Sequence, residues 1–211
     1  MFKTIFHGSS AIIEKPLFGF GKPYNDYGRG FYCTECIEMA KEWGVSKHND
    51  GFANIYEIKM DDLKVFNLNS GEYSLLHWLA ILLENRVFST DSALAKEAKE
   101  YLLENFKLPY KDYDIITGYR ADDSYFSFAQ DFINGAISVR QLGNAMKLGK
   151  LGTQFVIRSE KAFDALVFKG YEVANWSEWL SKRENRDRSA RRQYFDVERN
   201  RRKRGDLYIV Q

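Results

Sequence analysis

Three short segments of the sequence combine residue types that can do chemistry with positions at the ends of expected strands. Residues 6–9 close the first strand with histidine, glycine and serine, and residues 28–34 run from a glycine-rich turn into a strand that contains Tyr32. A late strand begins at residues 153–154 with threonine and glutamine. Each segment alone is a weak motif, and only the ordered set of three is fairly specific.

Familiar catalytic signatures are absent from the sequence. There is no phosphate-binding Gly-Lys-Ser loop and no serine nucleophile elbow, and residues 28–30 lack the spacing of a dinucleotide fingerprint. Cys33 and Cys36 have no second pair of ligands, so no metal site is expected. The standard motifs therefore leave the function of this chain unassigned.

The composition bounds the class of protein. The chain has 211 residues, of which 45% are hydrophobic and 16% aromatic, which is typical of one folded domain and excludes a disordered or collagen-like chain. The apolar runs are too short for a transmembrane helix, and no signal peptide is recognisable. Together with only two cysteines, these features predict a soluble protein of the reducing cytoplasm with no membrane partner.

Positive charge is concentrated near the C-terminus. Residues 181–204 contain eleven Lys or Arg and four Asp or Glu, so this segment carries +7 and the rest of the chain −5. A basic stretch on an acidic body can bind nucleic acid or an acidic partner protein. It can equally be a solvated helix that packs on the acidic body through its few apolar residues: Ala190, Tyr194, Phe195 and Val197.

The elements that must position these residues follow from periodicity and breakers. The expected strands are residues 3–7, 31–34, 52–60, 63–66, 113–118, 154–157 and 207–210. The expected helices are residues 35–43, 75–84, 91–105, 125–133, 139–147, 160–166 and a long basic helix from Trp176, with Thr34 as the N-cap of the first. Residues 14–30 read as a long functional loop. Strands and helices without a regular βαβ rhythm predict an α+β fold.

Taken in order, the three segments resemble the ADP-ribosyltransferase superfamily of the diphtheria-toxin and poly-ADP-ribose-polymerase type. In that superfamily a strand ends in His-Gly-Ser or His-Gly-Thr, a Gly-x-Gly-Ile/Phe-Tyr strand opens a helix, and a late strand begins with Glu or a substitute. More narrowly, the chain looks like a bacterial family within that clan, known mainly as a domain of unknown function. The matching motifs are residues 26–32, 112–118, 121–123 and 154–156, and the resemblance covers about residues 4–168.

The resemblance implies a fold and an activity. The fold would be a split β-sandwich of two antiparallel sheets with surrounding helices over residues 1–175, with the basic C-terminal helix and final strand of residues 176–211 packed on the same domain. The activity would be transfer of ADP-ribose from NAD, the co-substrate, to a macromolecular acceptor, protein or nucleic acid. The bacterial family is often associated with a small neighbouring antitoxin, which would make this chain the toxin of a toxin–antitoxin pair.

The resemblance also assigns the site residues. His7, Tyr32 and Gln154 would be catalytic. His7 would hydrogen-bond the adenosine-side ribose, the Gly8 backbone would pair with the nicotinamide carboxamide, and Tyr32 would stack on the nicotinamide ring for about 1 kcal/mol. The residues that would bind NAD are His7, Gly8, Ser9, Arg29, Gly30 and Tyr32, with Arg29 reaching a phosphate.

Gln154 departs from the pattern of the superfamily, where many relatives have a glutamate. A glutamine donates and accepts hydrogen bonds but supplies no negative charge and no general base. The candidate acidic substitutes are Asp122, Asp123 and Glu160, although Asp122 and Asp123 can instead cap the following helix. The alternative function is therefore a catalytically inactive module that binds nucleic acid or a partner protein through its basic C-terminal helix.

Overall fold

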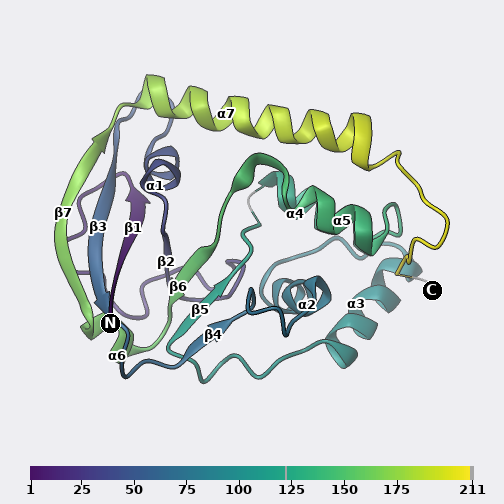
Figure 1. The fold of residues 1–211 in the computed structure, drawn as a ribbon, viewed down its shortest axis with the longest axis horizontal. Helices are drawn as coiled ribbons and strands as arrows, with labels where there is room; N and C mark the ends of the chain where they lie inside the picture. The colour runs from purple at the N-terminus through teal and green to yellow at the C-terminus, as the bar shows by residue number, and fades with distance from the viewer. Residues whose placement is uncertain (122, 210–211) are drawn as a thin grey trace.

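Seven strands form one mixed sheet in the computed structural model, which describes residues 1–121 and 123–209 (Figure 1). The strands are β1 Phe2–Ser9, β2 Phe31–Thr34, β3 Gly51–Lys59, β4 Val65–Asn67, β5 Ile115–Gly118, β6 Gln154–Ile157 and β7 Leu166–Ala174. The helices are α1 Ile37–Gly44, α2 Leu75–Asn85, α3 Ala93–Asn105, α4 Asp123–Ile133, α5 Val139–Ala145, α6 Glu160–Asp164 and α7 Trp176–Gln193, with short turns η1 Leu148–Lys150 and η2 Tyr194–Glu198. The predicted α+β class is confirmed.

The sheet has a weak seam in its middle. Its order is β4-β5-β6-β2-β1-β3-β7, and β1 pairs with β2 only at Phe6 and Thr34. By contrast, eight residue pairs join β1 to β3 and four join β2 to β6. The sheet therefore consists of two halves, β7-β3-β1 at the left of Figure 1 and β2-β6-β5-β4 beside it toward the middle.

The expectation of two separate antiparallel sheets needs correction. The seam pair makes the strands one sheet, and β4 runs parallel to β5. Parallel pairing is possible here because helices α2 and α3 lie between these two strands in the chain and form the long crossover that it requires.

Two large buried hydrophobic clusters form most of the core, and a third, small one joins Val45, Ala174 and Trp179. The largest surrounds α2, α3 and α4, and α2 is buried on most sides, as its nearly continuous apolar sequence predicts. The second lies between strands β1, β3 and β6 and helix α6. Helix α1 packs on β1 and β3 and also touches α7, which runs along the top of Figure 1 from above α1 to beyond α4.

Three local predictions are wrong. Strand β7 was not expected: helix α6 ends at Asp164, and β7 follows it as an edge strand whose burial alternates from Leu166 to Tyr171. Cys36, not Thr34, is the N-cap of α1. Residues 207–209 form no strand, and residue 210 lies outside the described residues. Val167, Phe168, Tyr171 and Val173 are of types that favour strands, and pairing with β3 supplies the hydrogen bonds that make this segment one.

The basic segment is helical from Trp176 to Glu198, through α7 and η2, as predicted, but residues 199–204 lie beyond the helix. Some of its cations attach the helix to the rest of the domain. Arg183 donates to the backbone oxygens of Glu42 and Val45 at the end of α1, at 3.0 and 3.4 Å. Arg186 donates twice to the Glu42 carboxylate, at 3.0 and 2.8 Å. No helix in the described ranges is both long and apolar enough to cross a membrane.

Candidate functional site

A cavity of about 620 Å³ opens at the seam of the sheet. Its wall brings together the predicted residues His7 and Gly8 from β1, Gly30 and Tyr32 from the second segment, and Gln154 from β6. Strands β6, β2 and β1 are adjacent in the sheet although they are distant in sequence. His7 and Gln154, which are 147 positions apart, therefore line the same cavity. The volume is within the usual range for small-molecule sites, roughly 300–1,000 Å³.

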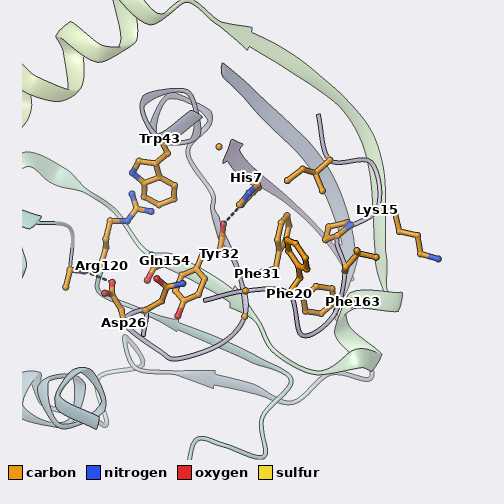
Figure 2. Close-up of a pocket in the computed structure, with 18 of the residues that line it drawn as sticks. His7, Lys15, Phe20, Asp26, Phe31, Tyr32, Trp43, Arg120, Gln154 and Phe163 are labelled. Atoms are coloured by element: carbon orange, nitrogen blue, oxygen red, sulfur yellow. Dashed lines mark hydrogen bonds between the residues drawn. The ribbon is translucent and has the colours of Figure 1, made fainter. Parts of the chain in front are cut away.

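The cavity has two chemically different ends with His7 and Tyr32 between them (Figure 2). One end, the polar end, is lined by Trp43, Arg120, Asp26 and Gln154. The other, the aromatic end, is lined by Phe20, Phe31 and Phe163, with Lys15 at its outer rim. A ligand that fills the cavity needs both a polar part and a flat apolar part.

His7 is held in one tautomer. Its Nδ1 lies 2.7 Å from the carbonyl oxygen of Tyr32, and since a carbonyl only accepts, Nδ1 carries the proton and donates. Burial lowers the pKa of His7 below 6.5, an effect that the bond to the Tyr32 carbonyl partly offsets. The ring stacks on Phe31 with centroids 4.2 Å apart. At neutral pH the ring is therefore uncharged, and Nε2 is a hydrogen-bond acceptor.

Tyr32 uses its hydroxyl inside the protein. The hydroxyl donates to the Gly28 carbonyl at 2.6 Å and accepts from the backbone N–H of Tyr27 at 3.0 Å. Burial, the largest cause, raises the pKa of the phenol far above its usual value, so it stays neutral. What Tyr32 can offer a ligand is its ring face, fixed in orientation by the turn that it closes.

Gln154 is the first residue of β6, and its side chain is buried. Its Oε1 has no hydrogen-bond partner among the described residues. Leaving a buried polar atom unpaired costs about 1–3 kcal/mol, so such an atom needs an explanation. In the wall of a cavity, the explanation is an acceptor that receives an O–H or N–H from a ligand.

The two predicted glycines of the cavity are required by packing. A Cβ at Gly8 would lie 2.0 Å from the Ala40 carbonyl oxygen of α1, and a Cβ at Gly30 would lie 2.7 Å from Val156 Cγ1. Close approach of α1 and of β6 therefore excludes a side chain at either position. Packing against α1 by itself therefore requires glycine at position 8.

Other predicted residues do not line the cavity. Ser9 donates to the Ala11 carbonyl at 2.6 Å, and Arg29, which is exposed, donates to the Gly19 carbonyl at 2.5 Å and braces the long loop. Glu160 is exposed in the first turn of α6. Asp122 lies outside the described residues, as does the side chain of Asp123. The structure thus brings neither Arg29 nor Glu160 to the site.

Apart from Gln154, sequence reasoning missed the residues at the polar end, which are Asp26, Trp43 and Arg120, and the adjacent Arg86. Asp26 is buried, its Oδ1 accepts from Arg86 at 3.0 Å, and its Oδ2 accepts from the backbone N–H of Ala121 at 2.8 Å. Arg120 is also buried, and its guanidinium lies over the indole of Trp43. Asp26 falls inside the glycine-rich motif and could have been found there, whereas Trp43, Arg86 and Arg120 belong to no motif.

Comparison with known proteins identifies a family for most of the chain. None of the curated proteins and none of the solved structures matches it. In the described ranges, no three His, Cys, Asp or Glu side chains form a group that could hold a metal ion. A family model described as "Protein of unknown function (DUF3990)" matches residues 3–168. The chain therefore belongs to the DUF3990 family.

Proposed function

We propose that this protein is an NAD-dependent ADP-ribosyltransferase and the toxin of a bacterial toxin–antitoxin pair. The observation that carries the proposal is the meeting of His7, Tyr32 and Gln154, from three different strands, in the wall of one cavity. These are the positions that the ADP-ribosyltransferase motifs assign to NAD binding and catalysis. In this proposal the two halves of the sheet correspond to the two sheets of the split sandwich, and the single residue pair at the seam supports that correspondence.

The side chains suit the bent NAD molecule that the reaction needs. Nε2 of His7 accepts from a ribose hydroxyl, since the neutral ring donates through Nδ1 to Tyr32. The ring of Tyr32 stacks on the nicotinamide, and Gln154 Oε1 accepts from a hydroxyl of the nicotinamide ribose. Each contact uses a group that the fold already holds in place, which lowers the entropic cost of orienting the substrate.

The reaction breaks the bond between nicotinamide nitrogen and the ribose carbon. The electron pair leaves with nicotinamide, the ribose becomes oxocarbenium-like, and a nucleophile of the acceptor forms a new bond to that carbon and loses its proton. Gln154 stabilises this state only as a dipole, because its carboxamide has no charge. A slower reaction than that of relatives with glutamate is therefore expected.

The test is release of nicotinamide from NAD by the purified protein, alone and with cell lysate, beside His7→Ala. Release that requires His7 supports the enzyme, and stimulation by lysate identifies a transferase rather than a plain NAD hydrolase. Circular dichroism and thermal unfolding check that His7→Ala remains folded. No release under either condition from a folded protein would contradict the proposal.

A binding module is the second candidate function, favoured by one specific observation. The segment Arg201, Arg202, Lys203 and Arg204 is exposed and has no carboxylate partner among the described residues except Asp206, which accepts from the Lys203 backbone. Such a cluster can bind nucleic acid or an acidic antitoxin. Reversing Arg191, Arg192, Arg201 and Arg202 to Glu would abolish cellular activity of a module, while His7→Ala would leave it intact.

A further inference from the structure

We propose that the polar end of the cavity is a subsite for a diphosphate group and that Arg120 is the residue that binds it. The inference rests on the proposed function for the identity of the ligand, since NAD carries a diphosphate between two nucleosides. It assigns the phosphate contact to a residue outside the three sequence motifs. It also replaces Arg29, which the resemblance assigned to a phosphate and which lies outside the cavity wall.

The charges of the cavity wall favour an anion. Its described cations are Lys15, Arg86 and Arg120, and its one described carboxylate is Asp26. Among the described residues around the polar end, the guanidinium groups of Arg86 and Arg120 outnumber the one carboxylate, that of Asp26, by one. The nearby His7 adds no charge at neutral pH, because burial lowers its pKa. An excess of buried positive charge is stabilised by an anionic ligand.

The backbone on both sides of Arg120 is fixed. The Tyr119 carbonyl accepts from the hydroxyl of Tyr27 at 2.6 Å and from the indole N–H of Trp78 at 3.1 Å. The Ala121 N–H donates to Asp26 at 2.8 Å. The guanidinium plane of Arg120 rests on Trp43. An arginine held in this way loses little freedom on binding, which favours paired hydrogen bonds to phosphate oxygens.

The rest of the cavity indicates a nucleotide rather than a free anion. The aromatic end offers Phe20, Phe31 and Phe163 to a flat ring, and His7 offers an acceptor to a sugar hydroxyl. A ligand with a base, a ribose and a diphosphate meets all of these surfaces. The chemical class is therefore a nucleoside diphosphate, as it occurs within NAD.

Binding of adenosine, ADP and ADP-ribose, measured by calorimetry at fixed ionic strength, tests the subsite. Wild type should bind ADP at least about tenfold more tightly than adenosine, and Arg120→Gln should lower this ratio about tenfold by removing the charged hydrogen bonds. Arg29→Gln is the matched control and should leave the ratio unchanged. An unchanged ratio in folded Arg120→Gln would overturn the inference.

Two further measurements keep the test decisive. Where Arg120→Gln does not fold, Arg120→Lys keeps the charge without the planar fork and should give an intermediate ratio; a ratio equal to that of wild type contradicts the subsite. Inorganic pyrophosphate should displace ADP from wild type, and failure to do so also contradicts it. If a single-stranded oligonucleotide binds more tightly than ADP and loses that binding in Arg120→Gln, the phosphate comes from nucleic acid and the assignment to a nucleotide is wrong.

The outcomes separate this inference from the proposed function. If the protein releases nicotinamide but its preference for ADP does not depend on Arg120, the proposed enzymatic function is supported and the proposed subsite is wrong. If the preference for ADP requires Arg120 but the protein releases no nicotinamide, the proposed subsite is supported and the proposed enzymatic function is wrong.

Discussion

The cavity at the seam and the basic C-terminal segment use charge in opposite ways. The cavity wall has few charged groups, but Asp26 and Arg120 are buried and come from distant parts of the chain. The basic segment has eleven cations within 24 residues, and most are exposed. Several are paired within their own helix, such as Lys182 with Glu178 at 2.6 Å and Arg191 with Asp187 at 3.0 Å.

This difference shows that charge density along the sequence identifies exposed basic segments but not single buried charges in a site. Charge density along the sequence identified the C-terminal segment, but part of that charge serves packing, since Arg183 and Arg186 bind the end of α1. Exposed pairs such as Arg191 with Asp187 contribute only about 0–1 kcal/mol. The charged residues of the cavity, Asp26 and Arg120, could be identified only from the fold, which brings them together and buries them.

The largest expected effect is on nicotinamide release, which should depend on the cavity and not on the basic segment. Tyr32→Ala should lower nicotinamide release about 100-fold, because the ring that orients the nicotinamide is lost. Tyr32→Phe keeps the ring and should retain most of the activity. Reversing Arg191, Arg192, Arg201 and Arg202 to Glu should leave release without acceptor within about threefold of wild type. Equal losses in Tyr32→Ala and the reversed variant would break the comparison.

A second prediction concerns stability in the basic segment. Arg186→Ala leaves the buried Glu42 carboxylate without its main partner and should lower the free energy of unfolding by about 3–5 kcal/mol. The exposed Arg188→Ala is the control and should change it by less than about 0.5 kcal/mol. Urea unfolding measures both. The double variant Glu42→Leu with Arg186→Met should recover much of the loss, and a full loss there would argue against the ion pair as the cause.

Gln154→Leu should lower nicotinamide release without lowering the stability of the protein. Leucine removes the unpaired Oε1, so stability should stay equal or rise by up to about 1 kcal/mol. Nicotinamide release should fall about tenfold, since the acceptor for the ribose hydroxyl is lost. Thermal unfolding and steady-state kinetics measure the two effects. A variant that is destabilised and fully active would show that the carboxamide serves the fold instead.

The pH dependence of stability should report the burial of His7. Its pKa in the folded protein lies below the unfolded value of 6.5, so between these two values the unfolded chain binds a proton that the folded protein does not. Stability from this group is therefore complete above about pH 6.5 and falls as the pH is lowered toward the folded pKa. The difference in unfolding free energy between wild type and His7→Gln, measured from pH 5 to 8, isolates this contribution. A difference that does not change with pH would show that His7 titrates normally.

The smallest expected effect tests the aromatic end. Phe20→Ser should raise KM for NAD about threefold with little change in kcat, because the exposed ring of Phe20 contributes contact area at the rim. Tyr24→Ser is the matched control: Tyr24 is exposed on the same loop but does not line the cavity. Steady-state kinetics on both variants measures the effect. Equal KM values for the two variants would remove Phe20 from the site.

Much of the local structure follows from local sequence. The pattern around residues 31–34 and 154–157 predicts β2 and β6 with their observed bounds, and the apolar run from Leu75 predicts a buried α2. These predictions succeed because strand and helix periodicity reflect which face is buried. Strand β7 was missed although Val167, Phe168, Tyr171 and Val173 favour a strand. Its charged residues and Gly170 interrupt the apolar pattern, and its partner strand β3 is distant in sequence.

The sequence by itself determined the types of the three central residues, His7, Tyr32 and Gln154, and the strands that carry them. Only the tertiary structure decided which charges join them. Asp26 and Arg120 enter the cavity because Asp26 accepts from the Ala121 backbone across 95 positions of sequence, and Arg29 is excluded because it binds the nearby Gly19 carbonyl. The physical reason is that a strand pattern depends on neighbouring residues, whereas the environment of a charge depends on which distant groups replace its water.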